Sequence, residues 1–477
     1  MELLIPLSKN AEPLFRQIYT GMRKAILVGA FPAGGRLPST REIAEQLGVS
    51  RTVVLMAYDL LLAEGFASGR GGAGTYVSEG VGKSTSKREN ASAQMRLSRY
   101  GSAALAAMEA VDTPRPSPYS VRYDFAFGRS AIENFPLEMW RRTLLRHLRK
   151  GPVRQFDYGQ AAGSRVLREA ICSHLRRSRG VVCDPSEVIV VNGSQQAIDL
   201  VARVLVERGD RVAIEDPQYN GTREVLRASG ARLLPVPVDG DGLNPAKLPE
   251  QAGLIFVTPS HQFPTGAILS LARRLALLDW ARRKNSIIVE NDHDGEFHYE
   301  GRPLESMQGL DTEGRIVYLG TFSRTVFPAL RIGYLIVPKS LGPAFVAAKW
   351  LNDLHSPTLE QDTLAEFINS GMYERHLRQL RRRHGARRKA LLAAVRTYLG
   401  DRVEVTGDGS GSHIVLWPLK QVSESTIVAQ AGSRGVGVYG IAHCYLKRPS
   451  RTGLIIGYSG MNEGPIREGI RILSEVL

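Results

Sequence analysis

From Tyr119 onward, short runs of apolar residues alternate with longer stretches in which apolar residues recur at helical spacing. Runs of three to five apolar residues fit buried strands, and the periodic stretches between them fit helices. Regular alternation of this kind is typical of an α/β domain with a largely parallel sheet. The expected strands are 188–191, 211–214, 254–257, 287–289 and 315–319.

Residues 1–78 show a different pattern, in which three short helical segments precede a glycine-rich hairpin. Ser39 and Glu42, three residues later, form a capping box that predicts the start of the second helix. Gly48 ends this helix, and Ser50 is expected to cap a third helix that begins at Arg51. Two short helices joined by a tight turn predict a helix-turn-helix, which meets DNA with the start of its second helix.

The hairpin has expected strands at 66–68 and 75–77, joined by a glycine-rich tip that carries Arg70. Glycine lets the backbone approach a duplex closely, and an arginine at such a tip can enter a groove. The alternative is a three-helix protein-binding module, but the caps, the turn and the wing together favour DNA. The residues expected to contact DNA are Ser39, Thr40, Arg41, Ser50, Arg51, Thr52, Arg70, Gly71, Gly72 and Thr75.

The unit over 13–77 resembles the GntR-type winged helix, whose signature is close to Gly-x-x-Leu-Pro-Ser-x-Arg-x-Leu-Ala-x-x-Leu-Gly-Val-Ser-Arg-x-Thr-Val. The chain departs mildly, with Ile43 in place of Leu and Thr52 directly after Arg51. The resemblance implies that Arg41, Arg51 and Thr52 contact DNA, together with the wing over 70–75.

A segment rich in Ser, Ala, Lys and Arg follows and ends in Pro-Arg-Pro-Ser-Pro, a composition typical of a linker. Only residues 105–111 have a pattern that fits a short helix there. The predicted domains are therefore 1–78, the linker 79–118, and 119–477.

The chain of 477 residues has a formal net charge of +15, which indicates an anionic partner. The charge is uneven: residues 1–78 hold eight Lys or Arg against six Asp or Glu, whereas 372–402 hold ten against two. The second cluster is interpreted either as a solvated helix face or as additional phosphate contacts.

Cys172, Cys183 and Cys444 are separated in sequence and form no CxxC pair, which favours a reducing cytoplasm and argues against a zinc site. No run has the length of a transmembrane helix, and the N-terminus lacks the pattern of a signal peptide. The sequence predicts a cytoplasmic protein without a membrane partner.

Residues Gly193, Ser194 and Gln195 lie between the expected strand at 188–191 and a helix. Free backbone amides at a helix start bind phosphate, so this turn is a candidate anion site. Thr321, Ser323 and Arg331 add hydroxyl and guanidinium donors from a second segment.

That second segment, 318–334, reads Tyr-Leu-Gly-Thr-Phe-Ser-Arg-Thr-Val-Phe-Pro-Ala-Leu-Arg-Ile-Gly-Tyr and resembles the lysine-bearing segment of fold-type I aminotransferases. The resemblance covers nearly all of 119–477 and implies a mainly parallel sheet, a smaller α+β C-terminal subdomain and pyridoxal 5′-phosphate as the family cofactor. It also implies that Tyr219 stacks on the cofactor ring and that Gln262 faces the ring hydroxyl. A winged helix, a linker and this domain in one chain resemble MocR/GabR-type bacterial transcription regulators.

Three positions depart from the family pattern. Arg324 stands where the family has its Schiff-base lysine, and a guanidinium stays charged without a free amine lone pair. Asn291 replaces the Asp that keeps the pyridine nitrogen protonated, and His293 replaces a Tyr that binds the ring hydroxyl. A shift of one residue would offer Asp292 as the pyridine partner but supplies no lysine. Covalent cofactor binding is not expected, and no catalytic residue is assigned.

His261 and His293 are expected to be pocket or packing residues, because the sequence shows no third ligand for a metal. The substrate-carboxylate arginine of aminotransferases is also unassigned: Gly453 stands near its position, with Arg451 close by.

Two functions remain in competition. The first is a DNA-binding regulator, homodimeric by the family resemblance, that reads two operator half-sites and senses a small molecule such as pyridoxal phosphate, an amino acid or another anion. The second is an active pyridoxal-phosphate-dependent aminotransferase with an appended DNA-binding module, which requires an amine nucleophile.

Overall fold

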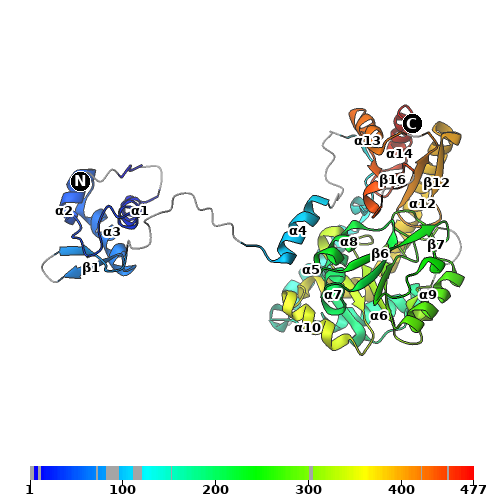
Figure 1. Cartoon of the computed structure of the whole chain (residues 1–477), viewed down its shortest axis with the longest axis horizontal. Coiled ribbons are helices and arrows are strands. Elements are labelled where there is room, and N and C mark those ends of the chain that lie inside the picture. The colour runs from blue at the N-terminus through cyan, green and yellow to red at the C-terminus, as the bar shows by residue number, and fades with distance from the viewer. Residues whose placement is uncertain are drawn as a thin grey trace. The chain divides into compact units, whose positions relative to one another are not determined.

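The computed structural model describes residues 5–8, 12–70, 74–81, 96–110, 121–151, 153–299, 305–420, 422–447, 449 and 451–477. The chain divides into two compact units, Met1–Arg96 and Leu97–Leu477, whose elements are labelled in Figure 1. Within the described residues, no helix combines the length and the apolar character needed to cross a membrane.

The first unit contains helices α1 (Leu14–Leu27), α2 (Thr40–Leu47) and α3 (Arg51–Ala63). The predicted capping box is present: Ser39 Oγ accepts from Glu42 N at 3.2 Å, and Glu42 Oε2 accepts from Ser39 N at 2.7 Å. Gly48 ends α2 with φ of 64°. Ser50 occupies the N-cap position of α3, but its side chain makes no capping hydrogen bond, so that part of the prediction is wrong.

Strands β1 (Ala67–Arg70) and β2 (Gly74–Val77) pair antiparallel, with Ala67 opposite Val77 and Arg70 opposite Gly74. The predicted strands 66–68 and 75–77 leave out the residues of β1 and β2 nearest the tip of the hairpin. Glycine at the tip weakens the sequence pattern of a strand there. The helices and the hairpin share one core, whose buried members include Ile18, Met22, Ile26, Ile43, Val54, Leu61 and Val77.

Helix α4 (Arg99–Ala110) begins the second unit and is longer than the short helix expected over 105–111. It packs on α8 (Asn220–Ala228), and the ring of its Tyr100 lies 5.8 Å from the guanidinium carbon of Arg203 in α7 (Ser194–Leu205). The sequence gives little sign of this helix because its stability comes from packing against residues distant in the chain.

An eight-stranded sheet forms the centre of the second unit (Figure 1). Its order is β4 (Val188–Val191), β11 (Gly333–Ile336), β10 (Ile316–Thr321), β9 (Ile287–Asp292), β8 (Leu254–Val257), β5 (Arg211–Asp216), β6 (Arg232–Asp239) and β7 (Gly242–Leu243). Strands β11 and β7 run antiparallel to their neighbours, and the other pairs are parallel, so the predicted mainly parallel sheet is present.

Helices cover both faces of this sheet, because alternate residues of each strand point to opposite faces. Val188 and Val190 pack with α5 (Leu137–Lys150), α6 (Arg165–Arg179), α9 (Leu271–Lys284) and α11 (Thr358–Asn369). Ile189 and Val191 pack with α7, α8 and α10 (Gly342–Asp353) on the other face. The result is a three-layer α/β/α arrangement.

The C-terminal part forms a smaller four-stranded sheet in the order β12 (Val403–Thr406), β13 (His413–Pro418), β16 (Leu454–Gly457) and β15 (Tyr439–Gly440). Helices α12 (Met372–Tyr398), α13 (Glu424–Ser433) and α14 (Glu463–Leu473) supply apolar residues to its core. Short strands β3 (Tyr123–Asp124) and β14 (Val436–Gly437) pair beside it.

The basic cluster over 372–402 is only partly a solvated face. Arg381 donates from Nε to the Glu296 carbonyl at 2.6 Å, and Arg387 bonds Glu133 at 3.0 Å from a buried position. Arg388 is also buried. The residues of the cluster that remain exposed on α12 are Arg375, Arg378, Arg382, Arg383, Lys389 and Arg396.

The cysteines are not all apart. The Sγ atoms of Cys172 in α6 and Cys183 lie 2.9 Å from each other, and both residues are buried. The turn after α6 brings them together, which their separation in sequence did not indicate.

Candidate functional site

The residues expected to contact DNA lie mostly on one exposed set of helix starts. Arg41, Arg51 and Thr52 are exposed at the first turns of α2 and α3. Arg51 Nε donates to Thr40 Oγ1 at 3.3 Å, which joins the two helix starts. Ser39 and Ser50 are exposed at the same two ends.

The hairpin carries one further cation, Arg70. The guanidinium carbon of Arg70 lies 4.9 Å from the centre of the Tyr76 ring, and Thr75 accepts from the Leu37 amide through its carbonyl. Gly71 and Gly72 lie outside the described residues. Arg36, which the sequence pattern did not single out, is exposed, and its backbone forms an isolated β-bridge with Tyr76 of the hairpin.

In the second unit, Gly193, Ser194 and Gln195 form the turn into α7. Gly193 has φ of 83°, and the amides at the helix start have no partner within the helix. The amide oxygen of Gln195 and the ring of Tyr219 both flank Gly221, so these two side chains lie next to each other.

Arg331 completes this turn. It adopts the left-handed conformation with φ of 52° and donates from its guanidinium to the Asn192 carbonyl at 3.0 Å. A Cβ on Gly193 would lie 2.5 Å from the same guanidinium, so only glycine fits there. The two sides of the predicted phosphate cup are therefore in contact.

Thr321 and Ser323 belong to the same cup. Thr321 lies opposite Gly333 in the sheet, and Gly333 lies opposite Val191, which directly precedes the α7 turn. Ser323 donates from its amide to Thr321 Oγ1 at 3.1 Å, and the two hydroxyls are also 3.1 Å apart. Helix-start amides, two hydroxyls and a guanidinium together can bind a phosphate or a carboxylate.

Strand alternation separates Asn291 from Asp292. Asn291 has the same parity in β9 as Val289, which packs with the helices α7, α8 and α10. Asp292 points to the opposite face, where Arg179 Nε donates to it at 2.8 Å and the Tyr318 hydroxyl donates to the same oxygen. Asn291 therefore lies on the face opposite Asp292, and its amide oxygen is buried and has no partner among the described residues.

Arg324 extends toward a buried carboxylate. Its Nε lies 3.7 Å from Asp294 Oδ1, with 18% of the arginine side chain and none of the aspartate side chain exposed. The guanidinium also lies against Gly128. Burial opposes ionisation of Asp294, but Arg324 holds the pKa of this carboxyl well below its usual range.

Tyr219 is the N-cap residue of α8 and is 37% exposed. Burial raises the pKa of its hydroxyl, while Arg324 and Arg331 both lower it. The phenol thus feels both guanidinium groups, and the ring is available for stacking by a flat ligand.

Gln262 is held by hydrogen bonds to its own loop and to the segment after β5. Its amide nitrogen donates to the carbonyls of Pro217 and Phe263, both at 2.7 Å, and its amide oxygen accepts from Thr265. The next residue, Phe263, has its ring 6.2 Å from the rings of both Tyr219 and His293. The sequence analysis missed this aromatic residue because an apolar side chain beside a proline looks like a packing residue.

His261, His293 and Asp294 come together from two loops, with all ligating atoms within 4.8 Å of one another. The sequence offered two histidines without a third ligand, and the structure places Asp294 beside both. His413 lies against His261, with the ring centres 4.8 Å apart.

Other groups that could serve an aminotransferase are engaged elsewhere. Lys349 is fully buried, donates to Ser356 Oγ at 3.1 Å and pairs with Asp353. Arg451 pairs with Glu404 and stacks 4.0 Å from the Trp417 ring. The residues present therefore fit the phosphate group of pyridoxal phosphate, but they do not fit a covalent bond to its aldehyde carbon.

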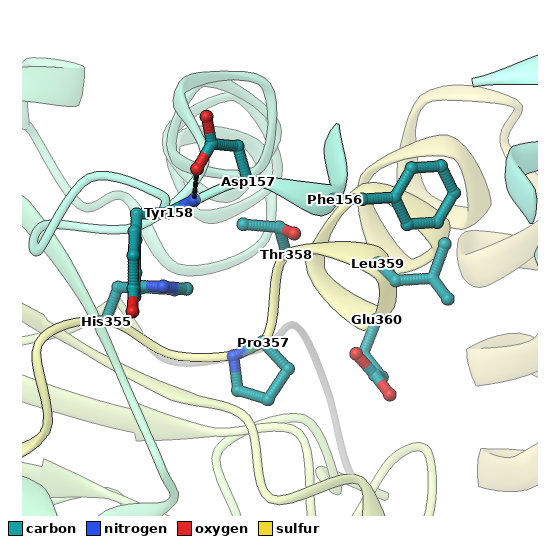
Figure 2. Close-up of a pocket in the computed structure, with 8 residues that line it drawn as sticks. All are labelled: Phe156, Asp157, Tyr158, His355, Pro357, Thr358, Leu359 and Glu360. Atoms are coloured by element: carbon teal, nitrogen blue, oxygen red, sulfur yellow. Dashed lines mark hydrogen bonds between the residues drawn. The ribbon is translucent and has the colours of Figure 1, made fainter. Parts of the chain in front are cut away.

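A surface groove of about 370 Å³ lies between the 156–158 segment and the start of α11, as Figure 2 shows. Tyr158 is 82% exposed there, and its ring meets His355 edge-on at 6.0 Å. Asp157 accepts the Tyr158 amide at 2.7 Å and fixes the turn (Figure 2).

Comparison with known proteins agrees with both units. Residues 14–77 match the model for bacterial regulatory proteins of the gntR family, and residues 125–463 match aminotransferase class I and II. The fold resembles the kynurenine aminotransferase of Pyrococcus horikoshii, with 26% identity, a TM-score of 0.71, and coverage of 80% of this chain and 95% of that one.

Two regulators resemble the chain over almost its whole length. The probable rhizopine catabolism regulatory protein MocR of Rhizobium meliloti is 38% identical, with 98% of this chain and 95% of that protein covered. The HTH-type transcriptional regulator YdeL of Bacillus subtilis is 33% identical, with 97% and 96% covered. The chain belongs to this MocR-type family, in which a gntR-type DNA-binding domain precedes an aminotransferase class I and II domain.

Proposed function

We propose that the chain is a DNA-binding transcription regulator whose second unit binds an anionic small molecule without chemical turnover. Two relatives that match 98% and 97% of the chain are named as regulators. The observation that carries the proposal is the guanidinium of Arg324 next to buried Asp294, at the position where the sequence resemblance predicts a Schiff-base lysine, together with the contact between Arg331 and the turn into α7.

Charge distribution in the pocket defines the class of ligand. Arg331 contacts the turn into α7, and Arg324 and Arg331 both oppose the rise in the pKa of Tyr219 that burial causes. A flat molecule with one phosphate or carboxylate group satisfies the cup, and a second polar or anionic group suits Arg324. Pyridoxal phosphate meets this description as a non-covalent ligand; when bound covalently in an aminotransferase it supplies an electron-accepting ring.

Calorimetry with two matched ligands tests the non-covalent mode. Pyridoxal phosphate and pyridoxine phosphate differ only at the carbon that a lysine attacks. We expect the wild-type chain to bind any such phosphate ester without preference for the aldehyde, and Arg331→Gln to weaken both equally. Arg324→Lys should create a preference for the aldehyde together with a Schiff-base absorbance band. A covalent link between the wild-type chain and the cofactor that borohydride reduction traps would instead establish the aminotransferase. Turnover of an amino donor would do the same.

A second copy of the chain is proposed as the partner of the apolar surface around the groove of Figure 2. Tyr158, which lines this groove (Figure 2), is 82% exposed, and Val153, five residues before it in the chain, is 86% exposed. Leu351, at the end of α10 and four residues before the groove residue His355, is 77% exposed. Apolar side chains this exposed in one region are typical of a covered interface. Light scattering should give a dimer for the wild type and a shift toward monomer for Leu351→Arg. Two readers in one dimer then require an operator with two half-sites.

A further inference from the structure

Three polar side chains converge on one buried point beside Arg324. His261 lies in the loop after β8, and His293 and Asp294 directly follow β9. His261 Nδ1 is 4.0 Å from Asp294 Oδ2, and one ligating atom from each of the three residues lies within 4.8 Å of those of the other two.

The hydrogen bonding of this cluster is incomplete. Among the described residues, no group forms a hydrogen bond of normal geometry with either ring nitrogen of His261, with His293 Nε2 or with Asp294 Oδ1, and these atoms are buried. A buried polar atom without a partner costs about 1–3 kcal/mol. His261, His293 and Asp294 each carry at least one such atom, and this indicates a missing polar occupant between them.

The chemistry of these donors suits a transition-metal ion. Imidazole nitrogen and carboxylate oxygen bind such ions in their deprotonated forms, so metal binding to the cluster should strengthen as pH rises.

We propose that His261, His293 and Asp294 bind a divalent transition-metal ion of the Zn²⁺ class. Two imidazoles and one carboxylate form an established ligand set for such ions and leave coordination positions open. Zinc–ligand bonds of about 2.0–2.2 Å require the donor atoms to move closer together by about 1 Å. Ser412 donates to Asp294 Oδ2 at 2.9 Å and orients the carboxylate, as second-shell groups do in metal sites.

Neighbouring groups limit the site to three protein ligands. His413 lies against His261, but its Nε2 contacts the Pro264 carbonyl at 2.9 Å. Arg324 lies 3.7 Å from Oδ1 of Asp294 and weakens cation binding by repulsion. The same guanidinium favours an anion as the remaining ligand of the ion, so the metal and an anionic pocket are compatible.

Titration of untagged, chelator-stripped protein with Zn²⁺ by calorimetry, and with Co²⁺ by visible absorption, tests the proposal. We expect one ion per chain and a Co²⁺ spectrum of low coordination number. His261→Gln and His293→Gln should each weaken binding at least about tenfold, since even loss of an outer-shell group has an effect of about 10–100-fold. His443→Gln, a histidine outside the cluster, is the matched control.

Melting curves show whether each variant is folded, and two independent ligand variants protect against failure of one. Absence of binding to the folded wild type would overturn the proposal and leave water as the occupant. Binding that neither ligand variant weakens, or that His443→Gln weakens equally, would overturn it as well. Because no DNA and no effector is present, the result is independent of the proposed regulatory function.

Discussion

Arg51→Gln is expected to reduce the salt dependence of DNA binding without unfolding the DNA-binding unit. Arg51 is exposed at the first turn of α3, and only its Nε is engaged, by Thr40. Each phosphate contact contributes about 0.9 to the slope of log affinity against log salt. One arginine in each protomer of a dimer therefore accounts for about 1.8 of the slope, which corresponds to roughly tenfold in affinity between about 50 and 200 mM salt.

Fluorescence anisotropy with a labelled mixed-sequence duplex measures this slope and needs no knowledge of the operator. Arg16→Gln, at an exposed position on α1, is the control and should leave the slope unchanged. A decrease near 0.9 would mean that one reader binds at a time. An unchanged slope for Arg51→Gln would refute the assignment of the α3 start to the DNA interface.

Three further predictions concern stability and thiol chemistry. Burial lowers the pKa of His384 to about 4, below its unfolded value, so the stability it contributes is present above about pH 6.5 and is lost as pH falls toward 4; His384→Leu should remove up to about 3 kcal/mol of this acid sensitivity in urea titrations. Equal acid sensitivity in wild type and variant would contradict it. Ser39→Ala should lower the free energy of unfolding of the DNA-binding unit by about 1 kcal/mol, because the capping box is lost, and calorimetry should show this as a lower melting temperature. An unchanged melting temperature would show that α2 does not depend on the capping box. Diamide should link Cys172 to Cys183, detectable by mass spectrometry, since the sulfurs need to move by less than about 1 Å to reach bonding distance; a link through Cys444 instead would count against the geometry.

Much of the central sheet could be predicted from apolar runs, because a strand buried on both faces is apolar at nearly every position. The predicted strand at 188–191 coincides with β4, whereas β9 continues past the predicted 287–289 as far as Asp292. The apolar run ends before Glu290, so the predicted strand ended there as well. A buried carboxylate can be recognised as part of a strand only when its hydrogen-bond partners are known. Here they are the amides of Met307 and Gln308.

The candidate site was only partly predictable, for a similar reason. Motif order identified Gly193 and Arg331, which contact each other. Side-chain direction was not available from the sequence, so the hydrogen bonds of the Gln262 amide nitrogen to the carbonyls of Pro217 and Phe263 could not be predicted. The neighbouring Phe263 and the carboxylate of Asp294 acquire significance only from residues that lie far away in the chain.

Helix α4 rests on the two helices that begin at the pocket. It packs on α8, which starts at Tyr219, and its Tyr100 lies against Arg203 of α7, which starts at the phosphate cup. Because a helix is stiff, a ligand that displaces the start of α7 or α8 also displaces the surface on which α4 packs. The helix that follows the DNA-binding unit in the chain therefore packs on the two helices whose starts form the proposed ligand site.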